Sequence, residues 1–256
     1  MKPHIITTAM LLLSLGKSFA QLNESDTLRF QLRASLTGSY QHGNVEVLNI
    51  KGRLDLTFSQ QHWVYKSQNS SLYQAFYNTK ADNDIFSRNY LYYQPRRRVY
   101  PFAIAYLSTN FRRKISNRYF AGTGVSWQVI NTPKTVIKLS ASEVYEVTKF
   151  TSKVFNYSVY NGSEAIKLWR GTLYLSGWHN LMAGGIRLYY DAYWQPSFRD
   201  RHNYRTQLDI GTDLSVWKGF SFTALFTYMH ENVVAAGIRQ NDKLLSFGLS
   251  YNLKRK

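Results

Sequence analysis

The chain has 256 residues, a formal net charge of +17 and no cysteine. Aromatic residues make up 16% of it and charged residues 18%, and the mean hydropathy is −0.36. The chain is therefore too polar for a helical membrane protein and too aromatic for a disordered polycation. The lack of cysteine excludes disulfides, thiolate metal sites, a cysteine nucleophile and a lipid anchor on an N-terminal cysteine.

The first twenty residues predict a secretory signal peptide. Lys2 gives a basic start, residues 5–15 are mostly apolar, and Ser18 and Ala20 are the small residues that a signal peptidase reads. An N-terminal membrane anchor is the alternative, but a spanning helix needs about 20 apolar residues. We expect residues 1–20 to be removed and residues 21–256 to form one domain in the cell envelope of a Gram-negative bacterium. This location favours lipid phosphates over nucleic acid as partners of the basic surplus.

From residue 27 onward, apolar and polar residues alternate with a period of two. In the first segment Leu28, Phe30 and Leu32 alternate with Arg29, Gln31 and Arg33. This period is typical of strands that separate an apolar from a polar environment. It predicts about twelve strands, at 27–41, 45–59, 62–78, 84–94, 99–111, 117–130, 135–149, 165–177, 181–194, 203–216, 219–230 and 242–253. Between 62 and 111 the pattern leaves the strand boundaries and the inward faces open.

The connections and the aromatic residues favour a barrel in a membrane. Bacterial barrels have an even number of strands, both termini in the periplasm and short periplasmic turns. Most connections that this rule places on the inner side are short, including one at 177–181, and the two longest, about 150–164 and 231–241, fall on the outer side. Aromatic residues near strand ends are typical of interfacial girdles: Tyr40, Trp63, Tyr90, Trp127, Trp169, Trp178, Trp194, Trp217 and Tyr228.

The predicted fold class is therefore all-β: a single transmembrane antiparallel up-and-down β-barrel. Only a closed sheet pairs every backbone polar group in hydrocarbon without helices. A soluble β-sandwich or a lipocalin-like barrel with an apolar interior shows the same alternation and is the alternative.

Three short motifs resemble a known family. They are SYQHGN at 39–44, RYFAGTG at 118–124 and FGLSY at 247–251, the last preceded by an apolar strand at 222–228 and a loop ending in Asn241-Asp242. In order and spacing they resemble the salt-induced outer-membrane proteins, a bacterial family of unknown function. The resemblance covers nearly the whole chain after the signal, and it implies an outer-membrane barrel with no catalytic residues to transfer. The chain departs at Lys254 to Lys256, where many outer-membrane proteins end on an aromatic residue.

No constellation in the sequence indicates catalysis, a metal or a cofactor. No serine, histidine and acid share one strand face, and Asp82-Asn83-Asp84 is better explained as a solvated outer loop than as a cation site. Gly122 and Gly124 lie in mid-strand without a following helix, so they indicate close packing rather than a phosphate loop. We predict that the chain is not an enzyme and has no cofactor.

The basic residues form two groups. One lies at connections, where Arg112-Arg113-Lys114 and the pair Arg199 and Arg201 are expected outside the cell, positioned to bind phosphates of outer-membrane lipids and lipopolysaccharide. The other group points inward by alternation. The lumen-facing residues expected from this pattern are Arg29, Arg33, Lys51, Arg53, Asp55, Lys138, Arg170, Arg187, Arg205, Asp209 and Asp213.

The inward basic surplus predicts an envelope protein of passive or structural role, with a narrow anion-preferring pore as the finer hypothesis. A lumen closed by a salt-bridge network fits the same residues, because small barrels fill themselves with side chains. An outer-membrane lipid hydrolase or acyltransferase and a secreted soluble binding protein are the alternatives. The expected location is the outer membrane, the expected state a monomer, and the barrel-assembly machinery an expected partner.

Overall fold

The computed structural model describes residues 28–41, 46–77, 79–182 and 185–255, so the predicted signal peptide and the loop at Gly43-Asn44 lie outside the described residues. In this part the chain forms twelve strands and one short 3-10 turn, η1 (Ser158–Tyr160). The strands are β1 (Phe30–Gln41), β2 (Val47–Gln60), β3 (Trp63–Phe76), β4 (Thr79–Tyr93), β5 (Val99–Asn110), β6 (Ile115–Asn131), β7 (Thr135–Phe150), β8 (Ala165–Leu181), β9 (Ile186–Pro196), β10 (Tyr204–Trp217), β11 (Phe220–Glu231) and β12 (Asn241–Arg255). Over the described ranges, no helix is long and apolar enough to span a membrane.

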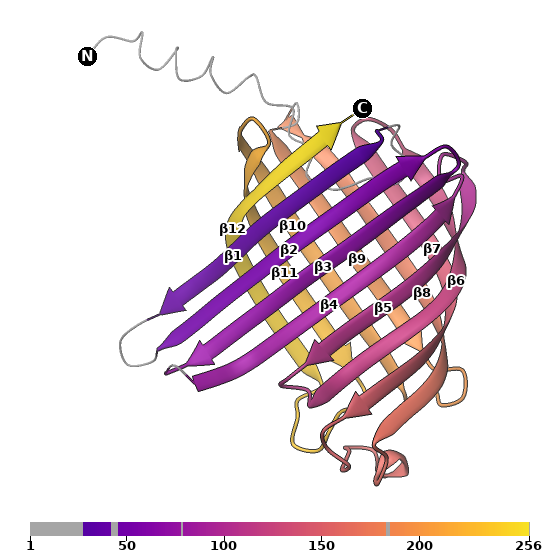
Figure 1. The fold of residues 1–256 in the computed structure, drawn as a ribbon, viewed down its shortest axis with the longest axis vertical. Helices are drawn as coiled ribbons and strands as arrows, with labels where there is room; N and C mark the ends of the chain where they lie inside the picture. The colour runs from indigo at the N-terminus through magenta and orange to yellow at the C-terminus, as the bar shows by residue number, and fades with distance from the viewer. Residues whose placement is uncertain (1–27, 42–45, 78, 183–184, 256) are drawn as a thin grey trace.

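The strands close into one antiparallel barrel. Each strand pairs with its neighbours in sequence, and β1 pairs with β12 to complete the ring. The start of β1 and the end of β12 lie at the same end, which we call the terminal end (Figure 1). The opposite, loop end carries the two longest connections, residues 151–164 and 232–240. The predicted twelve-stranded barrel is thus confirmed.

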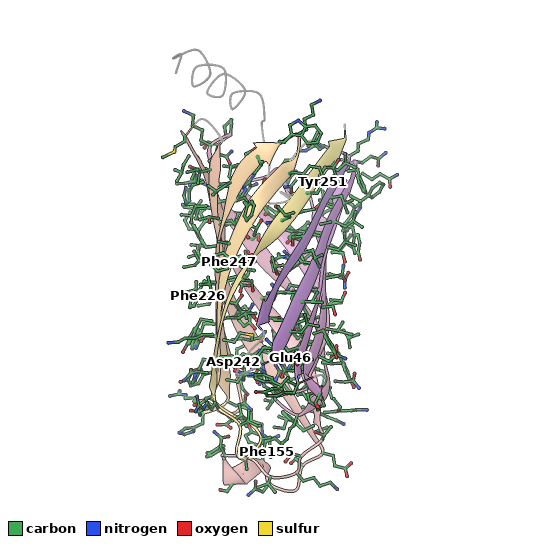
Figure 2. The ribbon with its side chains drawn as sticks, turned by 90° about the vertical axis from the view of Figure 1, so that its left-hand side faces the viewer. Glu46, Phe155, Phe226, Asp242, Phe247 and Tyr251 are labelled. Atoms are coloured by element: carbon green, nitrogen blue, oxygen red, sulfur yellow. The ribbon has the colours of Figure 1, made fainter. Side chains whose placement is uncertain are left out.

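The outer face of the barrel is apolar. Leu36, Leu107, Leu173 and Phe247 each expose half or more of their surface, although all four lie in strands. Figure 2 shows Phe226, Phe247 and Tyr251 on the outside of β11 and β12. In water such a continuous apolar belt would be unstable, whereas in lipid it is the surface that a membrane barrel presents. A lipocalin-like barrel would have the opposite polarity.

Aromatic side chains lie near the ends of the outer face, with two exceptions to the prediction. At the terminal end Trp63 packs on Tyr93 with ring centroids 4.9 Å apart. Toward the loop end Trp169 packs on Tyr145 at 5.2 Å. Tyr90 and Trp178, however, are only 8% exposed and lie inside the barrel rather than in a girdle. Their partners across the strands, Lys66 and Val136, are also inside, so pairing register rather than residue type decides the face.

Two predicted turns are strand in the structure. β4 begins at Thr79, so Asp82-Asn83-Asp84 belongs to a strand and not to a solvated loop. Asp84 there accepts hydrogen bonds from Asn110 Nδ2 at 2.7 Å and from the backbone N–H of Phe111 at 3.1 Å. β8 continues through Gly177 to Leu181.

Gly177 lies inside a strand, and the packing of a neighbouring ring, rather than a turn, explains why this position is a glycine. A methyl group added to Gly177 would come within 2.6 Å of the hydroxyl of Tyr190 on β9. Glycine therefore makes room for that ring, and the turn follows four residues later.

The seam between β1 and β12 is a short ladder. It joins eight residue pairs, from Phe30↔Arg255 to Thr37↔Gly248, as many as the ladder between β4 and β5. β1 continues to Gln41 paired only with β2, and β12 begins at Asn241 paired only with β11. From the end of this ladder the two strands diverge toward the loop end (Figures 1 and 2). The end of β1 and the start of β12 therefore do not pair with each other across the seam.

Candidate functional site in the barrel lumen

The polar half of each strand faces the lumen, and most residues predicted there lie inside. Those that are buried are Arg33, Asp55, Lys138, Arg170, Arg187, Arg205 and Asp213. Lys51, Arg53 and Asp209 are partly buried. Arg29 differs from the prediction, because it precedes β1 and is exposed at the terminal end.

Near the loop end, charged side chains from several strands meet in what we call the loop-end network. Glu146 of β7 is its centre: one carboxylate oxygen accepts from Arg170 Nε at 3.1 Å, and the other accepts from Arg205. Arg118 of β6 makes two parallel hydrogen bonds to Glu231 of β11, at 2.7 and 2.8 Å. Arg170 lies on β8, the neighbour of β7, but the other two contacts join strands that are not neighbours, β7 with β10 and β6 with β11. These side chains therefore extend across the lumen rather than line it.

Arg113 extends this network and corrects one sequence-based expectation. We expected the segment Arg112-Arg113-Lys114 to point outward to lipid phosphates. The Arg113 side chain is instead 3% exposed, and its Nη2 lies 2.7 Å from a carboxylate oxygen of Asp242. Arg112 remains half exposed, at 49%. The partly exposed carboxylate of Asp242 attracts one arginine of the run inward, and only the other two residues of the run stay exposed to solvent.

A second group lies near the terminal end and is called the terminal-end network. Arg33 of β1 donates to both carboxylate oxygens of Asp213 at 3.1 and 3.2 Å, and Thr223 donates to the same carboxylate at 2.6 Å. Beside it the guanidinium carbon of Arg187 lies 3.9 Å from the ring centroid of Trp178. Charge and aromatic surface together fill this end of the lumen, as expected for a narrow barrel.

Between the two networks lies a small cavity of about 50 Å³. Four basic residues reach its wall, and in the described part of the chain no acidic residue does. The rest of the wall combines aromatic rings with serine, threonine and glutamine side chains. The basic residues are Lys66, Arg88, Lys138 and Arg205, and the rings are those of Tyr90, Tyr92, Phe102, Tyr106, Phe120, Tyr174 and Tyr193.

Loops cover part of the barrel at the loop end. Residues 151–164 and 232–240 form a two-loop cap, in which Phe155 pairs with Ala235 and packs among Ile166, Leu168 and Val233. Figure 2 shows Phe155 beyond the ends of the strands. The backbone N–H of Ala236 donates to the carbonyl of Val154 at 2.8 Å. The two loops thus hold each other through both backbone pairing and an apolar cluster.

One tyrosine ties this cap to the loop between β9 and β10. The Tyr160 hydroxyl donates to Asp200 at 2.6 Å and accepts from Asn203 Nδ2 at 3.0 Å. Burial and the bond to the Asp200 carboxylate raise the pKa of Tyr160 to about 12. The neutral hydroxyl is therefore the form that holds the cap in place.

The described histidines contact groups other than a serine nucleophile. His230 Nδ1 lies 2.7 Å from Asn241 Oδ1, His179 Nδ1 lies 3.3 Å from Thr135 Oγ1, and His202 lies 3.6 Å from Asp200. Within the described ranges no group of three histidine, cysteine, aspartate or glutamate side chains is arranged to hold a metal ion. The chemistry of the interior is thus dominated by arginine, lysine and tyrosine.

Alternation did not identify several residues that turn out to be central to the lumen. Arg118 and Glu146 lie on predicted strands, and extending the parity of Lys138 along β7 would have placed Glu146 inside. Glu231 falls in the predicted outer loop 231–241, whereas in the structure it is the last residue of β11 and its carboxylate accepts from Arg118 in the lumen. Arg88 and Lys66 carry no such signal. The segment 62–94 mixes polar and aromatic residues on both faces. Only the pairing register of β3 and β4 shows that Lys66, Arg88 and Tyr90 share the inner face.

Comparison with known proteins places the chain in a family. Residues 34–253 match the family described as "Protein of unknown function, DUF481". The chain belongs to this family. The description of this family does not mention salt. A comparison with curated proteins gave no match.

Two solved structures are similar to this DUF481 protein. It is similar to the NanC porin, with 11% sequence identity, a TM-score of 0.52, and coverage of 88% of this chain and 100% of that chain. It is also similar to an outer membrane channel from Pseudomonas putida F1, with 12% identity, a TM-score of 0.47, and coverage of 91% and 100%. The likeness to the NanC porin shows an outer-membrane-type barrel fold.

Proposed function

We propose that the protein resides in the bacterial outer membrane, with both termini in the periplasm, and acts as a narrow passive channel that prefers anions. The observation that carries this proposal is the cavity wall, which has four basic residues and, in the described chain, no acidic one. A cation in this space would meet lysine and arginine at close range, whereas an anion would be attracted.

The two networks explain why such a channel would be narrow. The Arg33–Asp213 pair at one end and the Arg118–Glu231 pair at the other place side chains across the lumen. Water and small ions can pass between such groups, but large solutes would have to break the ion pairs. We therefore propose slow permeation of small anions rather than the general diffusion of a wide porin. The exposed Arg199 and Arg201 support lipid phosphates as partners of the loop end.

Planar-bilayer recording tests this function. The refolded protein without residues 1–20 is first checked for heat-modifiable migration on a gel. Reversal potentials are then measured in a salt gradient with small anions and cations of equal mobility. A small, stable, anion-selective conductance is expected. A cation-selective conductance would contradict the anion preference, and a folded, inserted barrel without current would show that the lumen is closed and the role structural.

A further inference from the structure

Three consecutive arginines form an exposed turn at the terminal end. Arg96, Arg97 and Arg98 connect β4 with β5, and all three are exposed. Among the described residues, no carboxylate lies within 4 Å of their guanidinium groups. Like charges this close together repel one another. The turn therefore favours an anion that comes from outside the chain.

A buried side chain of β6 holds the backbone of this turn in place. Gln128 is 5% exposed, and its Nε2 donates to the carbonyl oxygens of Pro95 and Arg97 at 2.7 Å each. Its backbone N–H donates to the carbonyl oxygen of Arg98 at 2.8 Å. The guanidinium carbon of Arg98 lies 5.8 Å from the ring centroid of Trp127, which is exposed on the outer face of the wall. Because the backbone is already ordered, the turn loses little conformational entropy when its side chains bind a ligand.

The outer face of the barrel is hollowed along β5, next to this turn. The hollow measures about 510 Å³, and the small outward residues Pro101 and Ala103 of β5 line it. On one side Leu91 of β4 pairs with Ala103, and on the other Val125 of β6 pairs with Pro101. Two further exposed side chains of its wall are those of Trp63 and Tyr93. An open apolar hollow of this kind fits a flexible hydrocarbon chain, which gains dispersion contacts along its length.

The distance from the arginines to the hollow is that from the headgroup to the chains of a lipid. Ala103 lies five residues after Arg98, which corresponds to about 17 Å along an extended strand. The exposed rings of Tyr93 and Trp127 lie near the turn, as expected of the aromatic residues at a membrane interface. A phosphate bound at the turn therefore leaves its acyl chain beside the hollow.

We propose that the turn and the hollow, which together we call the Arg98 site, bind an anionic phospholipid. Two oxygens of the phosphodiester accept parallel hydrogen bonds from the Arg98 guanidinium, and Arg96 and Arg97 add positive potential. One acyl chain lies in the hollow over Pro101 and Ala103. The site goes beyond the proposed channel and rests only on the proposed membrane location, in which the terminal end lies in the periplasmic leaflet.

Calorimetric titration of the folded barrel in detergent tests the site without reference to current. Phosphatidylglycerol is the probe, phosphatidylcholine with the same chains is its zwitterionic counterpart, and glycerol 3-phosphate is a phosphate without chains. Phosphatidylglycerol should bind roughly tenfold more tightly than either. Arg98→Gln should weaken phosphatidylglycerol binding by roughly tenfold, as expected for loss of a charge-assisted hydrogen-bond pair. Lys218→Gln, at another exposed cation that lies over a tryptophan at the terminal end, should leave it unchanged.

Filling the hollow tests the position of the acyl chain. Ala103→Phe should weaken phosphatidylglycerol and phosphatidylcholine binding alike, because both lose the same chain contacts, whereas Arg98→Gln should affect phosphatidylglycerol alone. Ala103 is exposed on the outer face, so the larger side chain causes no clash inside the barrel. Ala34→Phe, the same change in β1 and outside the hollow, is the control.

Several results would overturn the site. Equal binding of phosphatidylglycerol and phosphatidylcholine by the folded wild type would contradict it, as would tighter binding of lipopolysaccharide that Arg98→Gln weakens. Arg98→Lys keeps the charge but not the planar fork, so its affinity should fall between wild type and Arg98→Gln, and it serves if Arg98→Gln fails to show heat-modifiable migration. Phosphatidylglycerol binding without any conductance would support the site and overturn the channel, and an anion current without phosphatidylglycerol binding would do the reverse.

Discussion

Arg118 on β6 and Glu231 on β11 face each other across the lumen and make two parallel hydrogen bonds, of 2.7 and 2.8 Å. The side chains are only 10% and 15% exposed, so water competes weakly for them. Arg113 Nη1 lies 3.8 Å from the same carboxylate. Glu231 thus neutralises two arginines that belong to the opposite wall, and the pair acts as a strut that limits how far the walls can separate.

Removing the charge of Glu231 should weaken the barrel. Glu231→Gln leaves Arg118 without its carboxylate, and we expect the free energy of unfolding to fall by roughly 1.5–3 kcal/mol. Urea titration followed by gel mobility measures this change. Glu164→Gln, at a 75% exposed side chain, is the matched control and should leave the free energy of unfolding unchanged. Equal effects of the two changes would mean that the strut contributes nothing.

Glu146 should limit anion selectivity, because its carboxylate pairs with Arg205, one of the four basic residues of the cavity wall. It contacts Arg170 and Arg205, and Arg205 reaches the cavity wall. Glu146→Gln should shift the reversal potential further toward that of a purely anion-selective channel. Glu143→Gln changes the same residue type on the exposed face of the same strand and should not shift it. A shift toward cations would contradict the proposed charge balance.

Neutralising the cavity lysines should have the opposite effect. In the double variant Lys66→Gln and Lys138→Gln the anion preference should fall, since two charges leave the wall. Lys149 and Lys167 lie in β7 and β8 with exposed side chains, and the same double change there is the control. Paired reversal-potential measurements separate the two variants. If both reduced the preference equally, surface charge rather than the lumen would set selectivity.

The cap should loosen at high pH. Tyr160 has an ordinary pKa of 10.0 that rises to about 12 in the folded protein. Its contribution is fully present below pH 10 and is lost between pH 10 and 12, because there the unfolded chain releases the proton before the folded one. Cleavage of the 151–164 loop by a protease active in alkali should therefore increase over this interval. Tyr160→Phe should cleave faster below pH 10 and show less change with pH.

The fold could be predicted because the two faces of the wall differ so strongly in polarity. Alternation along segments such as β1 and β10 fixed both the strands and their inward residues, including Arg33 and Arg205. The prediction failed where the lumen itself is aromatic. Tyr90 and Trp178 pack against other lumen residues, so an aromatic side chain no longer identifies the outer face.

The networks and the cavity could not be predicted from alternation. Which arginine meets which carboxylate depends on the register and the curvature of the closed wall, as Arg113 and Asp242 show with 129 residues between them. Arg88 is the same kind of case. Its inward position follows only from the pairing register of β3 and β4, and the lack of an acidic neighbour among the described residues appears only when strands from the opposite wall are in place.

The short seam has a consequence for how the barrel forms. Every other ladder joins strands that are neighbours in sequence and can form as a local hairpin, whereas β1 and β12 are about 200 residues apart. The largest single loop-closure entropy of folding therefore opposes this one step, which eight residue pairs must stabilise. Before that step the chain is a curved open sheet with two bare edges, the form most prone to pair with another chain. Any factor that assists assembly thus needs to act only at the seam between β1 and β12, where it shields the two strand edges until they pair.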